Sequence, residues 1–230
     1  MRRLILIACV LLAGSGLLRP AHAGARHWAF QTPFGTYNDK TLRTGFAVYQ
    51  ADCARCHGLS LVPYRNIKAL GLSRRRLASI MARIKKKKAL DAKGAPSAKK
   101  IHRAMPPDLS LIEEGHRDGP DYVYSLLTGY RPAPPGLSLR PHYYFDIAYP
   151  GRQIAMPPAL KPGSVTLPDG QKPGVRVMAH DVAAFLAWTA HPDLDRRKAA
   201  GAGMFILLLI LGIIGGRLVL ARRRITDKQI

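Results

Sequence analysis

Acidic residues and cysteines are scarce in this sequence. Its 230 residues hold 14 Asp and Glu against 36 Lys and Arg, a formal net charge of +22, and only three cysteines. Three cysteines are too few for a small disulfide-stapled domain. The excess of positive charge makes nucleic acid the first anionic partner to consider. Apolar residues make up 47% of the chain, which is enough to bury a core and excludes wholesale disorder.

The first residues follow the order of a secretory signal. Two arginines precede an uncharged, mostly apolar run over 4–18, and residues 21–23 read Ala-His-Ala. Small residues at both ends of that triplet are typical of a signal-peptidase site, and the apolar run is shorter than the ~20 residues of a membrane span. We expect residues 1–23 to be a signal peptide, removed together with Cys9.

The other end of the chain reads as a membrane anchor. Residues 199–221 are apolar apart from Arg217, and at 1.5 Å per residue they reach roughly 34 Å, enough to cross a bilayer core of about 30 Å. Basic residues in the tail 222–230 place that tail in the cytoplasm. Residues 24–198 would then lie in the periplasm, attached to the inner membrane of a bacterium. An exported domain without a nucleic-acid motif is not expected to bind nucleic acid.

The exported part is predicted to be mainly α-helical with long irregular loops. Apolar residues at helical spacing predict helices at Thr41–Cys53, Tyr122–Leu127 and His180–Ala190, with Asp181 in the first turn of the last. The loops between these helices are rich in proline and glycine, which is typical of a domain that wraps around a cofactor.

A basic segment interrupts this domain. Residues 74–100 hold eleven Lys or Arg and one Asp, a net charge of +10. Such a block is usually a solvated excursion, and the functional alternative is docking to an acidic partner or to anionic headgroups.

The most specific motif is the C-x-x-C-H sequence of Cys53, Cys56 and His57, the attachment signal for haem c. Each thiol can add to one vinyl group of the same porphyrin, and the histidine can bind the iron as its fifth ligand. A thioredoxin-like site would need a βαβ setting, a zinc site a second pair of ligands, and a structural disulfide would leave His57 without a role. We expect one covalent haem c.

The sixth ligand of the iron is open from local sequence. Met105 and Met156 both occur in an Ala-Met-Pro-Pro phrase, in which proline would fix the loop that presents the sulfur. Methionine ligation raises the reduction potential. Bis-histidine ligation remains the alternative. Its candidates are His102, His116, His142 and His180.

At this point the sequence resembles the cytochrome c1 family, the haem-bearing subunits of the cytochrome bc1 complex. The resemblance rests on the order of several phrases together with the C-terminal anchor. The phrases are His27-Trp28 to Tyr37, Arg43 to Tyr49, Tyr64-Arg65, Pro106 to Ile112 and Asp121 to Tyr130.

The resemblance implies a cytochrome c-like haem domain and a set of site residues. Met156 becomes the sixth ligand and Met105 a packing residue, since in the family the ligand methionine follows the phrase that ends here at Tyr130. Tyr122 matches a tyrosine near a haem propionate. The chain departs from the family at His116-Arg117, where the family usually reads Arg-His, so no arginine is assigned to a propionate.

The resemblance also implies partners and a function. Cytochrome b and the Rieske iron–sulfur protein would share the complex, and single electrons would pass from the Rieske protein to a soluble carrier. The chain would act as the electron-transfer subunit of a quinol–cytochrome c oxidoreductase, with no catalytic residues of its own. The family is commonly acidic where residues 74–100 carry +10, which indicates either an acidic soluble carrier or an environment in which carboxyl groups are protonated and acidic surfaces are ineffective.

Two other functions stay open. One is the haem subunit of a different membrane oxidase or dehydrogenase. The other is an exported thiol-disulfide oxidoreductase that uses Cys53 and Cys56.

Overall fold

The computed structural model describes residues 26–71, 78, 82, 106–167 and 170–226. The expected signal peptide, most of the basic segment 74–100, His102 and Met105 therefore lie outside the described residues. Most of the described elements are helical, which confirms the expected fold class. They are η2 (Ala29–Gln31), α2 (Asp39–Val48), η3 (Tyr49–Cys53), α3 (Tyr64–Ala69), α6 (Pro120–Thr128), β1 (Tyr144–Phe145), β2 (Gln153–Ile154), α7 (Val175–Ala190) and α8 (Leu194–Thr226).

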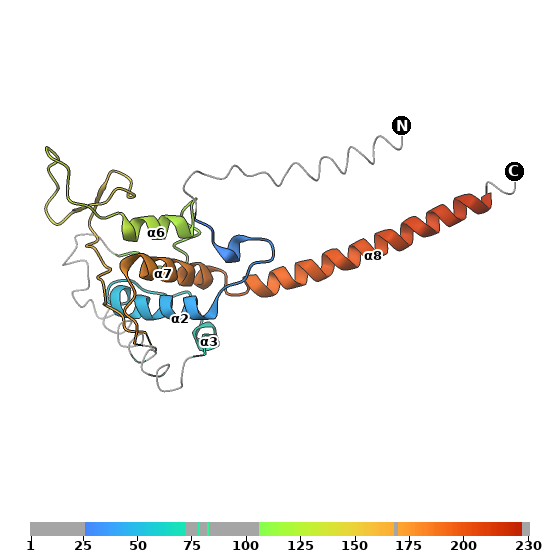
Figure 1. Cartoon of the computed structure of the whole chain (residues 1–230), viewed down its shortest axis with the longest axis horizontal. Coiled ribbons are helices and arrows are strands. Elements are labelled where there is room, and N and C mark those ends of the chain that lie inside the picture. Colours follow the sequence, from blue (N-terminus) through green and yellow to red (C-terminus); the bar gives the residue numbers. More distant parts are fainter. Residues whose placement is uncertain (1–25, 72–77, 79–81, 83–105, 168–169, 227–230) are drawn as a thin grey trace.

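Helices α2, α6 and α7 form the helical head, with α7 between the other two (Figure 1). Helix α2 begins where the Asn38 side chain accepts a hydrogen bond from the backbone N–H of Thr41 at 3.1 Å. Asp39 adds a negative charge to the first turn, which the helix dipole favours. The helix predicted at Thr41–Cys53 is confirmed, although its last turn, η3, is a wider π-helical turn.

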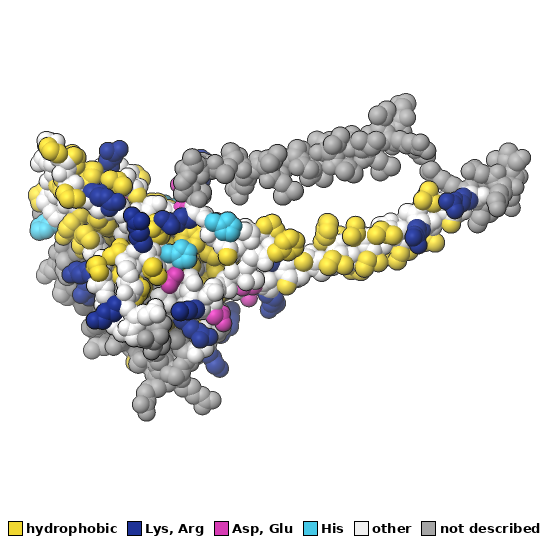
Figure 2. Space-filling view, in the orientation of Figure 1, with side chains coloured by type: hydrophobic (Ala, Val, Ile, Leu, Met, Phe, Trp, Pro, Cys, Tyr) yellow, Lys and Arg dark blue, Asp and Glu magenta, His cyan; other side chains and the backbone are white. Residues whose placement is uncertain are grey.

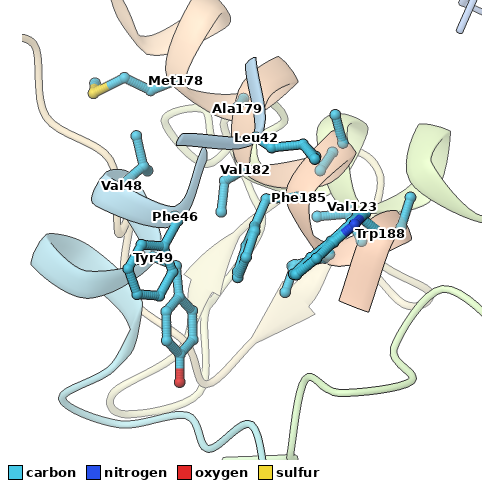
Figure 3. Packing of buried hydrophobic residues seen from close by; sticks show 14 of the residues in the cluster. Leu42, Phe46, Val48, Tyr49, Val123, Met178, Ala179, Val182, Phe185 and Trp188 are labelled. Carbon is cyan, nitrogen blue, oxygen red and sulfur yellow. The ribbon is translucent and has the colours of Figure 1, made fainter. Parts of the chain in front are cut away.

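The core of the head is the contact between α2 and α7. Phe185 is completely buried, and its ring centroid lies 5.4 Å from that of Phe46 and 5.9 Å from that of Tyr49 (Figure 3). These centroid separations are typical of favourable aromatic pairs. Gly45 lets the two helices approach closely, since a Cβ there would lie 2.0 Å from the carbonyl oxygen of Asp181.

Helix α7 begins earlier than its apolar pattern predicted. It starts at Val175, after Gly174 in an extended conformation, so Asp181 lies in its second turn. The expected favourable placement of Asp181 in the first turn is therefore wrong. The carboxylate instead contacts the neighbouring His180 ring at 3.0 Å and is buried against α2.

Helix α8 runs unbroken for 33 residues from Leu194 and leaves the head as a single rod (Figure 1). Within the described residues, one helical stretch, Leu194–Arg222, has the length and apolar composition to cross a membrane. Its apolar side chains face outward along the whole rod (Figure 2), with Phe205 69% and Leu218 66% exposed. Side chains this apolar need another phase or a partner to cover them.

Candidate functional site

The two cysteines of the C-x-x-C-H motif lie on one continuous turn. Cys53 ends η3 and is 8% exposed, and its carbonyl accepts hydrogen bonds from the backbone N–H of Cys56 at 3.0 Å and of His57 at 2.9 Å. The two thiols are not joined in a disulfide. The chain thus presents two thiols and an imidazole within one turn, as the motif predicts.

The Cys53 thiol is held in its protonated form. Burial raises its pKa to about 12, and the nearby Asp52 and Cys56 add to the shift. A thiol that attacks disulfides needs the opposite environment, one that lowers the pKa and exposes the thiolate. The local electrostatics therefore disfavour a thiol-disulfide oxidoreductase.

The His57 ring is oriented by the backbone of a distant segment. Its Nδ1 lies 2.8 Å from the carbonyl oxygen of Pro107. A carbonyl can only accept, so the proton sits on Nδ1 and the lone pair on Nε2. Histidines that bind metals commonly make this bond, because it fixes both the tautomer and the ring direction. The backbone is also held, since the Tyr49 hydroxyl donates to the carbonyl of His57 at 3.0 Å.

Asp108 ties the loop after the motif to the segment that carries Pro107. Its carboxylate accepts the backbone N–H of Ser60 at 2.8 Å and that of Ser110 at 2.9 Å, while the N–H of Leu109 donates to Gly58 at 2.9 Å. Partial burial alone would raise the pKa of Asp108, but the hydrogen bonds from Ser110 and Ser60 lower it below its usual value. The charged carboxylate therefore keeps the backbone at Ser60 and Ser110 joined.

Met156 follows a small hairpin formed by β1 and β2. It follows β2, which pairs antiparallel with β1, and its carbonyl accepts a hydrogen bond from the Tyr130 hydroxyl at 3.0 Å. The Met156 side chain is half-buried. Burial raises the pKa of Tyr130, so its hydroxyl keeps the proton that it donates.

The hairpin is anchored to the end of α6. Asp146 is fully buried, and its carboxylate accepts the backbone N–H groups of Ala148 at 2.8 Å and Tyr149 at 3.1 Å. A Cβ at Gly129 would lie 2.6 Å from the same carboxylate, so only glycine lets α6 end this close to it. The position of Met156 thus depends on backbone contacts made before and after it.

Tyr122 stacks face to face on His116, with ring centroids 3.7 Å apart. Burial raises its pKa, with further repulsion from Tyr149 and Asp146, which places the phenol beside the hairpin. His116 Nδ1 donates to the carbonyl of Ile112 at 2.9 Å. His116, one of the two residues at which the chain departs from the family pattern, therefore supports the ring of Tyr122.

The histidines considered as alternative ligands within the described residues have other surroundings. His180 stacks on Trp28 at 4.7 Å and contacts Asp181. His142 is exposed in a loop, with φ of 65°. Among the described residues, no group of three or more His, Cys, Asp or Glu side chains could hold a metal ion.

Comparison with known protein sequences identifies the family of this chain. A family model described as the Cytochrome C1 family matches residues 28–103 and 95–228. The chain belongs to the cytochrome c1 family. It is 31% identical to cytochrome c1 of Rhodospirillum rubrum, over 95% of this chain and 94% of that protein.

Mitochondrial family members are similar over most of the chain. Cytochrome c1 1, heme protein, of Arabidopsis thaliana is 33% identical over 81% of this chain and 67% of its own length. The cytochrome c1 heme protein of Saccharomyces cerevisiae is 32% identical over 84% of this chain and 69% of its own length. The matched family residues include the C-x-x-C-H turn, Met156 and all of α8.

Several residues that shape the site were not singled out by sequence reasoning. Pro107, Asp108 and Tyr130 lie in the phrases that carry the family resemblance, but nothing in those phrases showed what each residue contacts. Asp146 had a weaker signal, as an acid in a stretch otherwise rich in aromatic residues, proline and glycine.

Proposed function

We propose that this chain is the membrane-anchored haem subunit of a cytochrome bc1 complex. One haem c would be attached through Cys53 and Cys56, with His57 and Met156 as the iron ligands. The observation that carries the proposal is the 2.8 Å hydrogen bond from His57 Nδ1 to Pro107, on a turn with two unpaired thiols. When bound, the haem supplies reversible one-electron redox chemistry.

The residues around the turn would hold and shield the group. His57 is already oriented, so little freedom is lost when Nε2 binds a metal. Tyr130 fixes the backbone of Met156, and the half-buried Tyr122 offers a protonated phenol for a propionate. Asp108 holds the loop after the C-x-x-C-H turn, and Asp146 holds the hairpin before Met156, so both segments would be fixed before the group binds.

The remaining chain would fix the protein in the membrane. Residues 1–23 act as a cleaved signal and residues 24–198 form the periplasmic haem domain. Within that domain, residues 74–100 form a basic insertion. The anchor spans 199–221 within α8, and residues 222–230 remain in the cytoplasm, because basic residues follow the span. Electrons would come from the Rieske protein, beside cytochrome b, and leave to a soluble acceptor.

A haemochrome spectrum of the denatured chain after acid-acetone extraction tests the attachment. The full chain, made in a host that matures c-type cytochromes, should keep its colour on the polypeptide. The Cys53→Ser/Cys56→Ser variant should lose the colour on extraction. A colourless wild-type chain would contradict covalent haem. Titration of the Cys53 and Cys56 thiols would then test the alternative of a thiol-disulfide oxidoreductase.

The sixth ligand is tested with the two Ala-Met-Pro-Pro copies. Met156→Ala should abolish the methionine–iron charge-transfer band, because the sulfur would be gone, whereas Met105→Ala should retain it. Absorption spectra of the oxidised protein provide the measurement, and the reverse result would assign the ligand to Met105.

Copurification from membranes separates the bc1 complex from another oxidase or dehydrogenase. Cytochrome b and a Rieske protein should accompany the tagged chain at constant ratio. Their consistent absence would contradict membership of a bc1 complex without affecting the haem assignment.

A further inference from the structure

Three arginines line one side of the head. A cavity of about 440 Å³ opens beside the end of α6 and the start of α7. Among the described residues that line it there is no Asp or Glu. The positively charged members of its wall are Arg26, Arg131 and Arg176, which we call the arginine cleft.

Two of these arginines are held in place by the fold. The Arg26 guanidinium lies 3.5 Å from the centroid of the Tyr124 ring, a cation–π contact, and its backbone N–H donates to Asp121 at 3.1 Å. The Arg131 guanidinium donates to the carbonyls of Thr128 at 2.9 Å and Tyr130 at 2.6 Å. Charges held in this way lose little entropy when a ligand binds.

The third arginine stands at a helix start. Arg176 is exposed in the first turn of α7, where the helix dipole adds partial positive charge and no acidic residue offsets it. The cleft is therefore positive from both its side chains and its backbone.

An apolar hollow of about 350 Å³ adjoins the cleft. The two share Tyr130, Arg131 and Pro158. Tyr144, which lines this hollow, is 39% exposed. An apolar centre beside arginine and tyrosine is the composition of protein–protein contact surfaces.

Acidic side chains are scarce around this surface, although the Asp121 carboxylate accepts the backbone N–H of Arg26 at its edge. Between residues 129 and 176 the described chain holds one acid, Asp146, which is fully buried. In the view of Figure 2 the acidic side chains lie near the base of α8, while Lys and Arg extend to the other end. The basic residues of this stretch are Arg131, Arg140, Arg152, Lys161, Lys172 and Arg176.

The surface faces away from the membrane anchor. The loop after α6 and the start of α7 lie at the end of the head opposite to α8 (Figure 1). A lipid headgroup would have to be reached from the other end, so the position favours a soluble partner.

We propose that the arginine cleft and its apolar hollow form the docking surface for the acidic face of a soluble electron-acceptor protein. This rests on the proposed function, and it assigns the acceptor's contact site to this surface. Tyr130 lines both cavities, and its hydroxyl donates to the Met156 carbonyl, so a docked protein would lie near the proposed iron ligand. Carboxylates on the partner would pair with guanidinium groups that are already held in place. Such pairing raises the association rate and favours acidic partners over basic ones.

Binding of a soluble cytochrome c in two charge forms tests the proposal. The probes are a basic cytochrome c and the same protein with its lysines succinylated, which makes it acidic. With the full chain in detergent at low ionic strength, the succinylated form should bind about tenfold more tightly, and added salt should remove the difference.

Variants then show which residues of the chain cause the tighter binding of the succinylated form. Arg26→Gln/Arg176→Gln should weaken binding of the succinylated form about tenfold, since both changes remove charge from the cleft. Arg196→Gln/Arg197→Gln, at the base of α8, removes the same charge elsewhere and should bind as wild type. Arg176→Gln alone, at an exposed position, should give an intermediate loss and guards against a folding defect.

Binding that is unchanged in the cleft variants, or reduced equally in the α8 variant, would overturn the proposal. So would competition by inorganic phosphate that depends on the arginines while probe binding does not, because the cleft would then hold only a small anion. Electron transfer from the dithionite-reduced chain tests the underlying function separately. No transfer to either probe contradicts the proposed function, whereas equal transfer to both with unaffected variants contradicts the docking surface alone.

Discussion

At the scale of single residues, Tyr130 connects the end of α6 to the loop that carries Met156. Its hydroxyl donates to the Met156 carbonyl at 3.0 Å. Tyr130→Phe removes that donor and keeps the ring, so the unfolding free energy should fall by about 1 kcal/mol. If Met156 is the sixth ligand as proposed, imidazole should also displace it at roughly fivefold lower concentration, because that energy corresponds to about this ratio. Absorption titration with imidazole measures the second effect.

The neighbouring Tyr144 provides the matched control. It lies in β1 with 39% of its surface exposed. Tyr144→Phe should leave the imidazole titration unchanged. If both variants shift equally, the effect belongs to the hairpin as a whole and not to the hydrogen bond of Tyr130.

Glu113 is a buried acid that the proposed site does not use. It is 9% exposed, and burial, with repulsion from Glu114, raises its pKa to about 9. Between its usual pKa near 4.5 and about 9, the folded chain binds a proton that the unfolded chain has lost. Stability must therefore fall as the pH rises through this range, by about 1.4 kcal/mol per pH unit from this group.

Glu113→Gln should remove that dependence. The variant cannot ionise, so its unfolding free energy should exceed that of the wild type increasingly from pH 6 to pH 8. Urea unfolding of the full chain in detergent at several pH values measures the difference between the two curves. Parallel curves would show that Glu113 is ionised in the folded protein.

The proposed haem-binding residues illustrate what sequence can predict at this scale. Cys53, Cys56 and His57 are contiguous, so their spacing alone predicts one turn with a common ligand. Pro107 lies fifty positions from His57 and Tyr130 lies 26 from Met156, and only the packing of loops brings them together. Local patterns carry no information about such pairs.

At the scale of elements, the contact between α2 and α7 depends on Gly45. Gly45→Ala would place a Cβ 2.0 Å from the carbonyl of Asp181 and 2.7 Å from the Cβ of Phe185. Both neighbours belong to a rigid helix, so the helices must separate, and the unfolding free energy should fall by about 3 kcal/mol. Thermal unfolding followed by circular dichroism measures this loss.

Gly212→Ala is the control, since nothing lies within 4 Å of a Cβ at that position in α8. Its melting temperature should stay at or above that of the wild type, because alanine is the better helix former. A Gly45 variant that is as stable as this control would show that α2 and α7 can move apart at little cost.

Helices were easier to predict than their boundaries. The three predicted helices of the head are present, because each has apolar residues at helical spacing. α7 nevertheless starts at Val175 and not His180, since its first turn is only partly buried and so lacks the pattern. The hairpin escaped prediction for a related reason, as strands of two residues are too short to show an alternation.

At the scale of the whole molecule, the first turns of α8 fix the head to the anchor. The Lys198 ammonium group donates to the carbonyls of Phe30, Thr32 and Gly35 at 2.6, 2.7 and 2.8 Å. All three donor positions of a lysine are used in this way. Asp195 adds to the same joint by accepting the backbone N–H of Tyr37.

This joint connects the head, which carries the arginine cleft, to the proposed membrane anchor. Lys198→Met keeps the length of the side chain but removes the three donors, so the N-terminal segment should detach from α8 more often. Arg196 and Arg197 are exposed in the same turn, and trypsin should release the head about tenfold faster for each 1.4 kcal/mol lost. Lys161→Met, at an exposed loop position, should be cut at the wild-type rate. Gel analysis of membrane-bound protein over time measures both, and equal rates for wild type and Lys198→Met would show that the head is held by other contacts.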